Sequence, residues 1–181
     1  MTARSHPPRS LDVASFAAEG ASLAGRWPLA QLARLADGGV GEDVRWSVQG
    51  QLRAVPGGEP ETWLHLAATA RVQRECQRCL QPVELVLEVA RALRFVAGEV
   101  EAAALDAECE DDVLALPRSL DLRELVEDEL LLALPLVPAH EHCPRPLPMR
   151  VGEPPNDDDD EPDPTPHPFA ALARLKSGKG H

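Results

Sequence analysis

The residues most able to do chemistry are cysteines and histidines in two short segments far apart in the chain. Cys76 and Cys79 form a Cys-x-x-Cys pair in CQRC, and the segment HEHC spans residues 140–143. Thiolates and imidazoles are ligands that zinc prefers, and a two-residue spacing lets both donors of one turn face a single ion. The spacing predicts one tetrahedral zinc site, whose ligands are Cys76, Cys79, Cys143 and either His140 or His142.

Three other interpretations of these residues stay open at this point. The cysteines could be reduced thiols that never meet, and Cys109 is expected to take no part. A thioredoxin-type redox pair is disfavoured, because it needs a helix N-terminus, whereas Pro82 and an alternating, strand-like run follow Cys79. A zinc-dependent hydrolase or nuclease is the weakest alternative. HExxH, GxSxG, GxxxxGK[ST] and GxGxxG motifs are all absent from the sequence, which predicts that the protein is not an enzyme and has no small-molecule substrate.

Strands with alternating apolar and polar residues are expected on both sides of the CQRC turn. The alternation covers residues 44–49, 63–73 and 83–90, and the last run can continue to Phe95. Short connections between the three predict an antiparallel β-meander.

Helices are expected to pack on this meander. Residues 11–19 predict a short helix capped by Ser10 and ended by Gly20, and a second helical pattern runs from Pro28 to Asp37. The clearest helix begins at Asp121, with Glu124 three residues later in a capping-box arrangement. The solvent-exposed face of this helix is expected to include Glu127 and Glu129. Residues 98–112, which precede it, are expected to form an acidic loop. The predicted fold class is therefore α+β: an antiparallel β-meander with short N-terminal helices and one longer helix packed on it.

The 181-residue chain predicts one domain with a tail. The predicted divisions are a disordered start at 1–9, an α+β domain at 10–143, a disordered, acidic, Pro-rich linker at 144–168 and a short amphipathic peptide at 169–181. Phe169, Leu172 and Leu175 can share one face of that peptide and are candidates for partner docking. No secretory signal and no membrane-spanning run of apolar residues is visible, so a soluble cytoplasmic protein without a membrane partner is expected.

The net charge of −12 is concentrated in particular segments. Residues 1–98 carry a net charge of +1, residues 99–129 carry −10 and residues 130–181 carry −3. Nucleic-acid binding depends on local basic patches, so the acidic total does not exclude it. Candidate RNA contacts near the CQRC turn are Arg71, Arg74, Arg78, Arg91 and Arg94. An ordinary charged strand face is the alternative.

Three blocks of sequence, in this order, resemble the bacterial YceD family of large ribosomal RNA subunit accumulation proteins. They are CQRCLQPVELVLEV, LDLRELVEDELLLALPLVPAHEHC and HPFAALARLK. The chain departs from the family pattern at His167, where relatives often have Asn. The matching positions are Cys76, Cys79, Asp121, Leu122, Glu127, Glu129, Pro135, Cys143, Pro168 and Phe169.

The resemblance implies a bacterial, non-enzymatic factor in large ribosomal subunit biogenesis. It would support the synthesis, processing or stability of large-subunit ribosomal RNA. Its partners would be this RNA or its precursor, ribosomal proteins or processing proteins, and the predicted cofactor is one zinc ion. The alternative is a zinc-bound protein–protein adaptor that acts on ribosomal RNA only indirectly.

Overall fold

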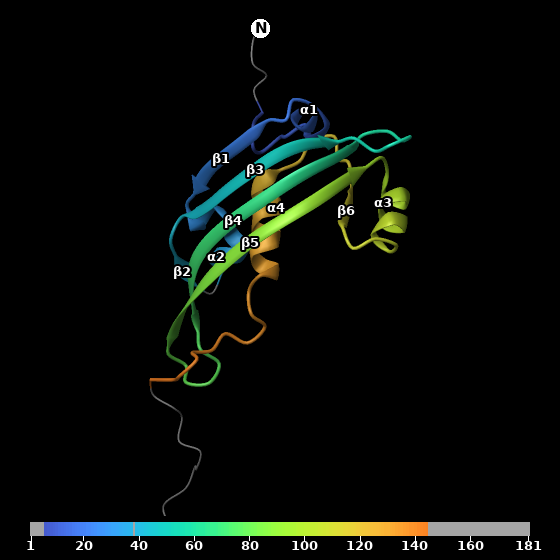
Figure 1. The fold of residues 1–181 in the computed structure, drawn as a ribbon. Helices are drawn as coiled ribbons and strands as arrows, with labels where there is room; N and C mark the ends of the chain where they lie inside the picture. The colour runs from blue at the N-terminus through green and yellow to red at the C-terminus, as the bar shows by residue number, and fades with distance from the viewer. Residues whose placement is uncertain (1–5, 38, 145–181) are drawn as a thin grey trace, which may run out of the picture. The chain divides into compact units, whose positions relative to one another are not determined.

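A twisted, largely antiparallel sheet with helices against one face dominates the fold. It is seen in a computed structural model that describes residues 6–37 and 39–144 (Figure 1). This architecture confirms the predicted α+β class. The elements in chain order are α1 (Val13–Ala18), β1 (Ser22–Trp27), the 3₁₀ helix η1 (Leu29–Gln31), α2 (Ala33–Ala36), β2 (Val40–Gly41), β3 (Val44–Arg53), β4 (Glu61–Glu75), β5 (Pro82–Val96), α3 (Glu99–Asp106), β6 (Asp112–Ala115) and α4 (Leu122–Leu132).

The β4–β5 hairpin forms the centre of the sheet. Its strands have 15 residues each and pair in antiparallel register from Thr62↔Phe95 to Glu75↔Pro82. The strand order is β1-β3-β4-β5-β6, and β2 pairs with the C-terminal part of β4. The predicted meander is thus β3-β4-β5. β6 pairs parallel to β5, because α3 carries the chain back to the same end of the sheet.

The hydrophobic core lies between one face of the sheet and the helices α1, α2 and α4. Residues of β3 alternate between buried and exposed, with Val44, Trp46 and Val48 pointing inward. Trp46 stacks on Trp27 of β1 with ring centroids 4.4 Å apart. Figure 1 shows α4 behind the strands, on the same side as α2.

The first helix differs from the expected one at its beginning. Asp12, not Ser10, caps α1, since its side chain accepts a hydrogen bond from the backbone N–H of Ser15 at 3.0 Å. The preceding residue, Leu11, is held in an antiparallel bridge with Leu120, which keeps it out of the helix. Gly20 ends this region as predicted and takes a φ of 58°.

The segment between residues 21 and 37 is less helical than its pattern predicts. β1 was not expected, because its small residues Ala24 and Gly25 weaken the alternation that indicates a strand. The helical pattern from Pro28 forms η1 and α2, two short pieces separated at Leu32, whose φ of −104° and ψ of 80° are not helical.

Two acidic regions also differ from expectation. The segment predicted as an acidic loop contains the eight-residue helix α3, which packs on β6. Glu127 of α4 was assigned to the solvent-exposed face, yet its side chain is buried. Its Oε1 accepts the backbone N–H groups of Arg34 at 2.7 Å and Leu35 at 3.1 Å, so the carboxylate satisfies donors in the first turn of α2.

All described residues belong to one compact unit, Met1–Pro146. Contacts of this unit include residues before Ser10: the His6 ring lies 5.1 Å from Phe16, and the Pro8 carbonyl accepts the Leu122 N–H at 2.8 Å. The predicted linker from residue 145 onward and the predicted terminal peptide lie outside the described residues. In the ranges 6–37 and 39–144, no helix is both long and apolar enough to cross a membrane.

Candidate metal centre

The tight loop between β4 and β5 positions the Cys-x-x-Cys pair. The Cys76 N–H donates to the Gln81 carbonyl at 2.9 Å, and the Leu80 N–H donates to the Cys76 carbonyl at 2.9 Å. These bonds fold CQRC into a turn at the end of the hairpin. Leu80 completes the turn with a φ of 59°, a conformation that is uncommon for a bulky residue. Both cysteines are buried, so the loop aims its thiols inward.

The second ligand segment reaches this loop from α4. After α4 ends, the chain runs to the tip of the β4–β5 hairpin (Figure 1). The Gln77 N–H donates to the Pro138 carbonyl at 2.8 Å, and Arg78 Nη2 donates to the Glu141 carbonyl at 3.3 Å. Ala139 and Cys143 pack against a small cluster of Cys76, Cys79 and Val83. Residues more than 60 positions apart are thereby brought together.

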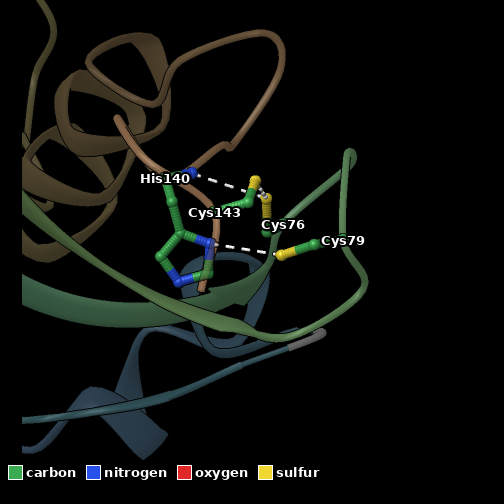
Figure 2. A group of neighbouring side chains, drawn as sticks. All are labelled: Cys76, Cys79, His140 and Cys143. Carbon is green, nitrogen blue, oxygen red and sulfur yellow. Dashed lines mark hydrogen bonds between the residues drawn. The ribbon is translucent and has the colours of Figure 1, made fainter. Parts of the chain in front are cut away.

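Four side chains converge between the two segments (Figure 2). The potential ligand atoms of Cys76, Cys79, His140 and Cys143, hereafter the Cys₃His cluster, all lie within 4.8 Å of one another. Cys76 Sγ lies 3.9 Å from Cys143 Sγ, and Cys79 Sγ lies 3.4 Å from His140 Nδ1. A tetrahedral zinc ion would require S–S separations of about 3.8 Å and S–N separations of about 3.6 Å, from its usual bond lengths. The cluster can therefore hold a metal ion with little rearrangement.

His140 supplies the fourth potential ligand atom of the cluster. Its Nε2 lies 3.0 Å from the Pro82 carbonyl, a contact that a protonated Nε2 makes as a donor. The Nδ1 lone pair then faces the three sulfurs. A carbonyl that orients the remote nitrogen in this way is the usual partner of a metal-binding histidine. Of the two histidines considered, the structure brings only His140 into the cluster.

The cluster also favours ionisation of one thiol. Burial acts to raise the pKa of Cys76, but backbone N–H groups of His140, Arg78 and Cys79 donate to its sulfur and lower the pKa to about 5. A thiolate that receives backbone N–H groups is prepared to bind a cation. Burial raises the pKa of the Cys143 thiol to about 11, and the neighbouring sulfurs of Cys79 and Cys76 act in the same direction.

Cys109 lies apart from this cluster. Its Sγ donates to the Leu105 carbonyl at 2.9 Å, at the end of α3. Among residues 6–37 and 39–144, the Cys₃His cluster is the group of cysteine, histidine and carboxylate side chains arranged to hold a metal.

The five arginines proposed to contact RNA do not form one surface. Arg71 lies near Glu84 at 3.3 Å, and Arg94 lies near Glu61 at 3.0 Å. Arg91 projects from the helix-covered side of the sheet and pairs with Glu129 of α4 at 3.0 Å. The other two donate hydrogen bonds to main-chain carbonyls: Arg74 to that of Leu35 and Arg78 to that of Glu141.

The remaining predicted site residues, Phe169, Leu172 and Leu175, lie outside the described residues, so partner docking by them stays a prediction. The sequence-based prediction missed the Pro82 carbonyl, because main-chain acceptors leave no signature in residue types. It also failed to predict that Glu127 is buried and accepts main-chain hydrogen bonds, because Glu127 belongs to the polar stripe of α4 in sequence.

Fold and cluster together define an α+β domain with a Cys₃His group that could hold a metal ion. The family model described as large ribosomal RNA subunit accumulation protein YceD matches residues 64–176. Those residues contain the whole Cys₃His cluster and most of the chain. The chain therefore belongs to the YceD family.

One curated relative is the large ribosomal RNA subunit accumulation protein YceD of Haemophilus influenzae. It is 43% identical over 74 residues, which cover 40% of this chain and 42% of the relative. The chain thus aligns with less than half the length of that relative. No solved structure matches the chain.

Proposed function

We propose that this protein is a non-enzymatic ribosome biogenesis factor that acts in the cytoplasm and is needed for the accumulation of large-subunit ribosomal RNA. The observation that carries the proposal is membership of the YceD family over residues 64–176, supported by the name of the Haemophilus influenzae relative. Accumulation can depend on synthesis, processing or stability of the RNA.

In this proposal the Cys₃His cluster holds one structural zinc ion. Catalytic zinc sites usually have three protein ligands and keep one position open for water or substrate, whereas structural sites are closed by four. Four protein side chains converge here, and Cys76 and Cys79 are buried. A closed centre supports a role in fixing the C-terminal end of the domain to the hairpin, without chemistry at the metal.

The direct test is the ratio of large- to small-subunit ribosomal RNA in a deletion strain. We expect this ratio to fall on deletion and to recover with the wild-type gene. A Cys76→Ser/Cys79→Ser variant is expected to restore it poorly, while Cys109→Ser serves as the matched cysteine control. An unchanged ratio in the deletion strain would contradict the proposed function.

One surface feature favours the alternative, a zinc-bound protein–protein adaptor. Leu80 in the ligand loop is 54% exposed and Val40 is 66% exposed, and both line a depression of about 340 Å³ at the end of β4. Exposed apolar side chains around a surface depression suit a protein partner. Crosslinking followed by RNA sequencing separates the two functions, because the adaptor predicts no protected large-subunit RNA fragments.

A further inference from the structure

The exposed face of the sheet carries a hollow that the arginines discussed above do not explain. Ala24, Ser47, Ala67 and Ala90 are exposed and lie in one row across β1, β3, β4 and β5. The register places them opposite one another in sequence: Ala24↔Ser47, Ser47↔Ala67 and Ala67↔Ala90. Four small side chains side by side leave a depression of about 670 Å³, hereafter the small-residue hollow.

Polar side chains occupy the next row of the same face. Ser22, Gln49 and His65 lie opposite one another on β1, β3 and β4, and line the hollow. His65 Nε2 lies 2.9 Å from Gln51 Oε1, which orients the imidazole at this edge. The hollow therefore offers hydroxyl, amide and imidazole groups around a floor of small residues.

A pair of arginines borders the opposite side of the hollow. Arg26 and Arg45 lie directly opposite each other on β1 and β3, and both are exposed. Like charges in such a cross-strand pair repel and cost stability. Within residues 6–37 and 39–144, neither arginine has an ion-pair partner. Across the sheet, this cross-strand row continues from Arg45 to Thr69 on β4 and Glu88 on β5, so the positive charge of the row lies at its β1 end. An anion bound between the two guanidinium groups would relieve the repulsion.

The charge of the hollow contrasts with that of the chain. None of its lining residues is Asp or Glu, although the chain has 30 acidic residues and a net charge of −12. It also presents no large exposed aliphatic or aromatic side chain, the type that anchors a protein partner. Arginine, serine, glutamine and histidine are instead typical contacts of phosphate and sugar groups.

The shape of the hollow distinguishes single strands from duplexes. A protein reads or grips an RNA duplex with elements that protrude toward its grooves, whereas a depression can receive an extended strand. We infer that the small-residue hollow binds single-stranded RNA through its sugar–phosphate backbone. Arg26 and Arg45 contact phosphates, and Ser47, Gln49 and His65 contact sugar and phosphate oxygens. The inference rests on the proposed function, and it identifies the surface through which the protein contacts RNA.

The test uses the full chain, a fluorescein-labelled 12-nucleotide single-stranded RNA and fluorescence anisotropy at several salt concentrations. Arg26→Gln/Arg45→Gln removes two phosphate contacts, each of which contributes about 0.7 to the salt slope of a single strand. We expect the slope to fall by about 1.4 and the affinity at 0.1 M salt to fall roughly 25-fold. Arg118→Gln/Arg123→Gln is the matched control, because both arginines lie outside the hollow and have no ion pair among the described residues.

A second variant tests shape without changing charge. Ala67→Leu fills the centre of the hollow on an exposed strand position; it is expected to weaken binding at least several-fold and to leave the melting temperature near that of the wild type. An RNA hairpin of the same composition is expected to bind more weakly than the single strand.

Three results would overturn the inference: no binding of the single strand by the wild type, equal loss in the control variant, or preference for the hairpin. Capture of a protein by the wild type but not by Ala67→Leu, without RNA binding, would assign the hollow to a protein instead. None of these results changes the ribosomal RNA ratio of the deletion strain. The hollow can therefore fail while the proposed function stands.

Discussion

Removal of the proposed zinc ion is expected to detach the segment from Pro135 to Cys143 from the β4–β5 hairpin, while the sheet stays folded. Outside the Cys₃His cluster, the described residues hold this segment with few interactions. They are the packing of Ala139 beside Val83 and the hydrogen bonds of the Pro138 carbonyl with Gln77, of the His140 ring with Pro82 and of the Glu141 carbonyl with Arg78. Leu136 beside them is fully exposed, so it adds no burial.

The magnitudes show why these bonds do not suffice. Three such hydrogen bonds contribute about 2–4 kcal/mol together. Ordering the nine residues from 135 to 143 costs at least about 9 kcal/mol in backbone entropy. The deficit of about 5 kcal/mol is smaller than the free energy of about 10–16 kcal/mol that structural zinc sites provide. The metal-free segment is therefore expected to be open most of the time.

Amide hydrogen exchange measured by NMR tests this prediction. The backbone N–H of Gln77 donates to Pro138, and that of His140 donates to Cys76 Sγ at 3.4 Å, so both amides report contact between the two segments. Chelation should accelerate their exchange by at least 100-fold, and added zinc should restore it. The Leu11 amide, bonded to Leu120 away from the cluster, is the internal control. Unchanged exchange at Gln77 and His140 after complete metal removal would show that the segment stays closed without the metal, contrary to this prediction.

Three further predictions concern single side chains. Glu127→Ala should lower the free energy of unfolding by about 3 kcal/mol, because it leaves two main-chain donors of α2 without their acceptor. Denaturant titration measures this loss, and a loss below about 1 kcal/mol would contradict the assigned role of Glu127. Asp121→Ala should cost about 1 kcal/mol, since the Asp121 carboxylate caps α4 by accepting the N–H groups of Arg123 and Glu124; equal stability in the same titration would argue against the cap. At pH 7, zinc uptake by Cys143→Ser should release about one proton fewer than uptake by the wild type, because the Cys143 thiol of the open, metal-free segment has an ordinary pKa of about 8.5 and loses its proton only on binding; calorimetry in two buffers of different ionisation enthalpy counts these protons, and equal release would contradict a ligand role for Cys143.

The sequence predicted the parts of the fold in which local pattern and tertiary structure agree. Strict alternation at Val44, Trp46 and Val48 marked β3, and Asp121 marked the beginning of α4. β1 was not predicted, because apolar and polar residues alternate only weakly in an edge strand that contains Ala24 and Gly25. The parallel pairing of β6 escaped because it depends on α3, whose sequence lacks a clear apolar stripe.

The ligands of the candidate centre were predictable from residue type and spacing, although the choice between His140 and His142 was not. Both histidines suit zinc equally well in sequence. The hydrogen bond from His140 to the Pro82 carbonyl decides between them, and it exists only after the chain after α4 meets the start of β5. The small-residue hollow was likewise invisible, because Ala24, Ser47, Ala67 and Ala90 become neighbours only through strand register.

The Cys₃His cluster is proposed to be a zinc centre that joins the end of the domain to the β4–β5 hairpin. Elemental analysis of protein purified without chelator tests it most directly. About one zinc per chain is expected for the wild type and for Cys109→Ser, and almost none for Cys76→Ser/Cys79→Ser. Absence of zinc from the wild type, even after incubation with zinc under reducing conditions, would contradict it.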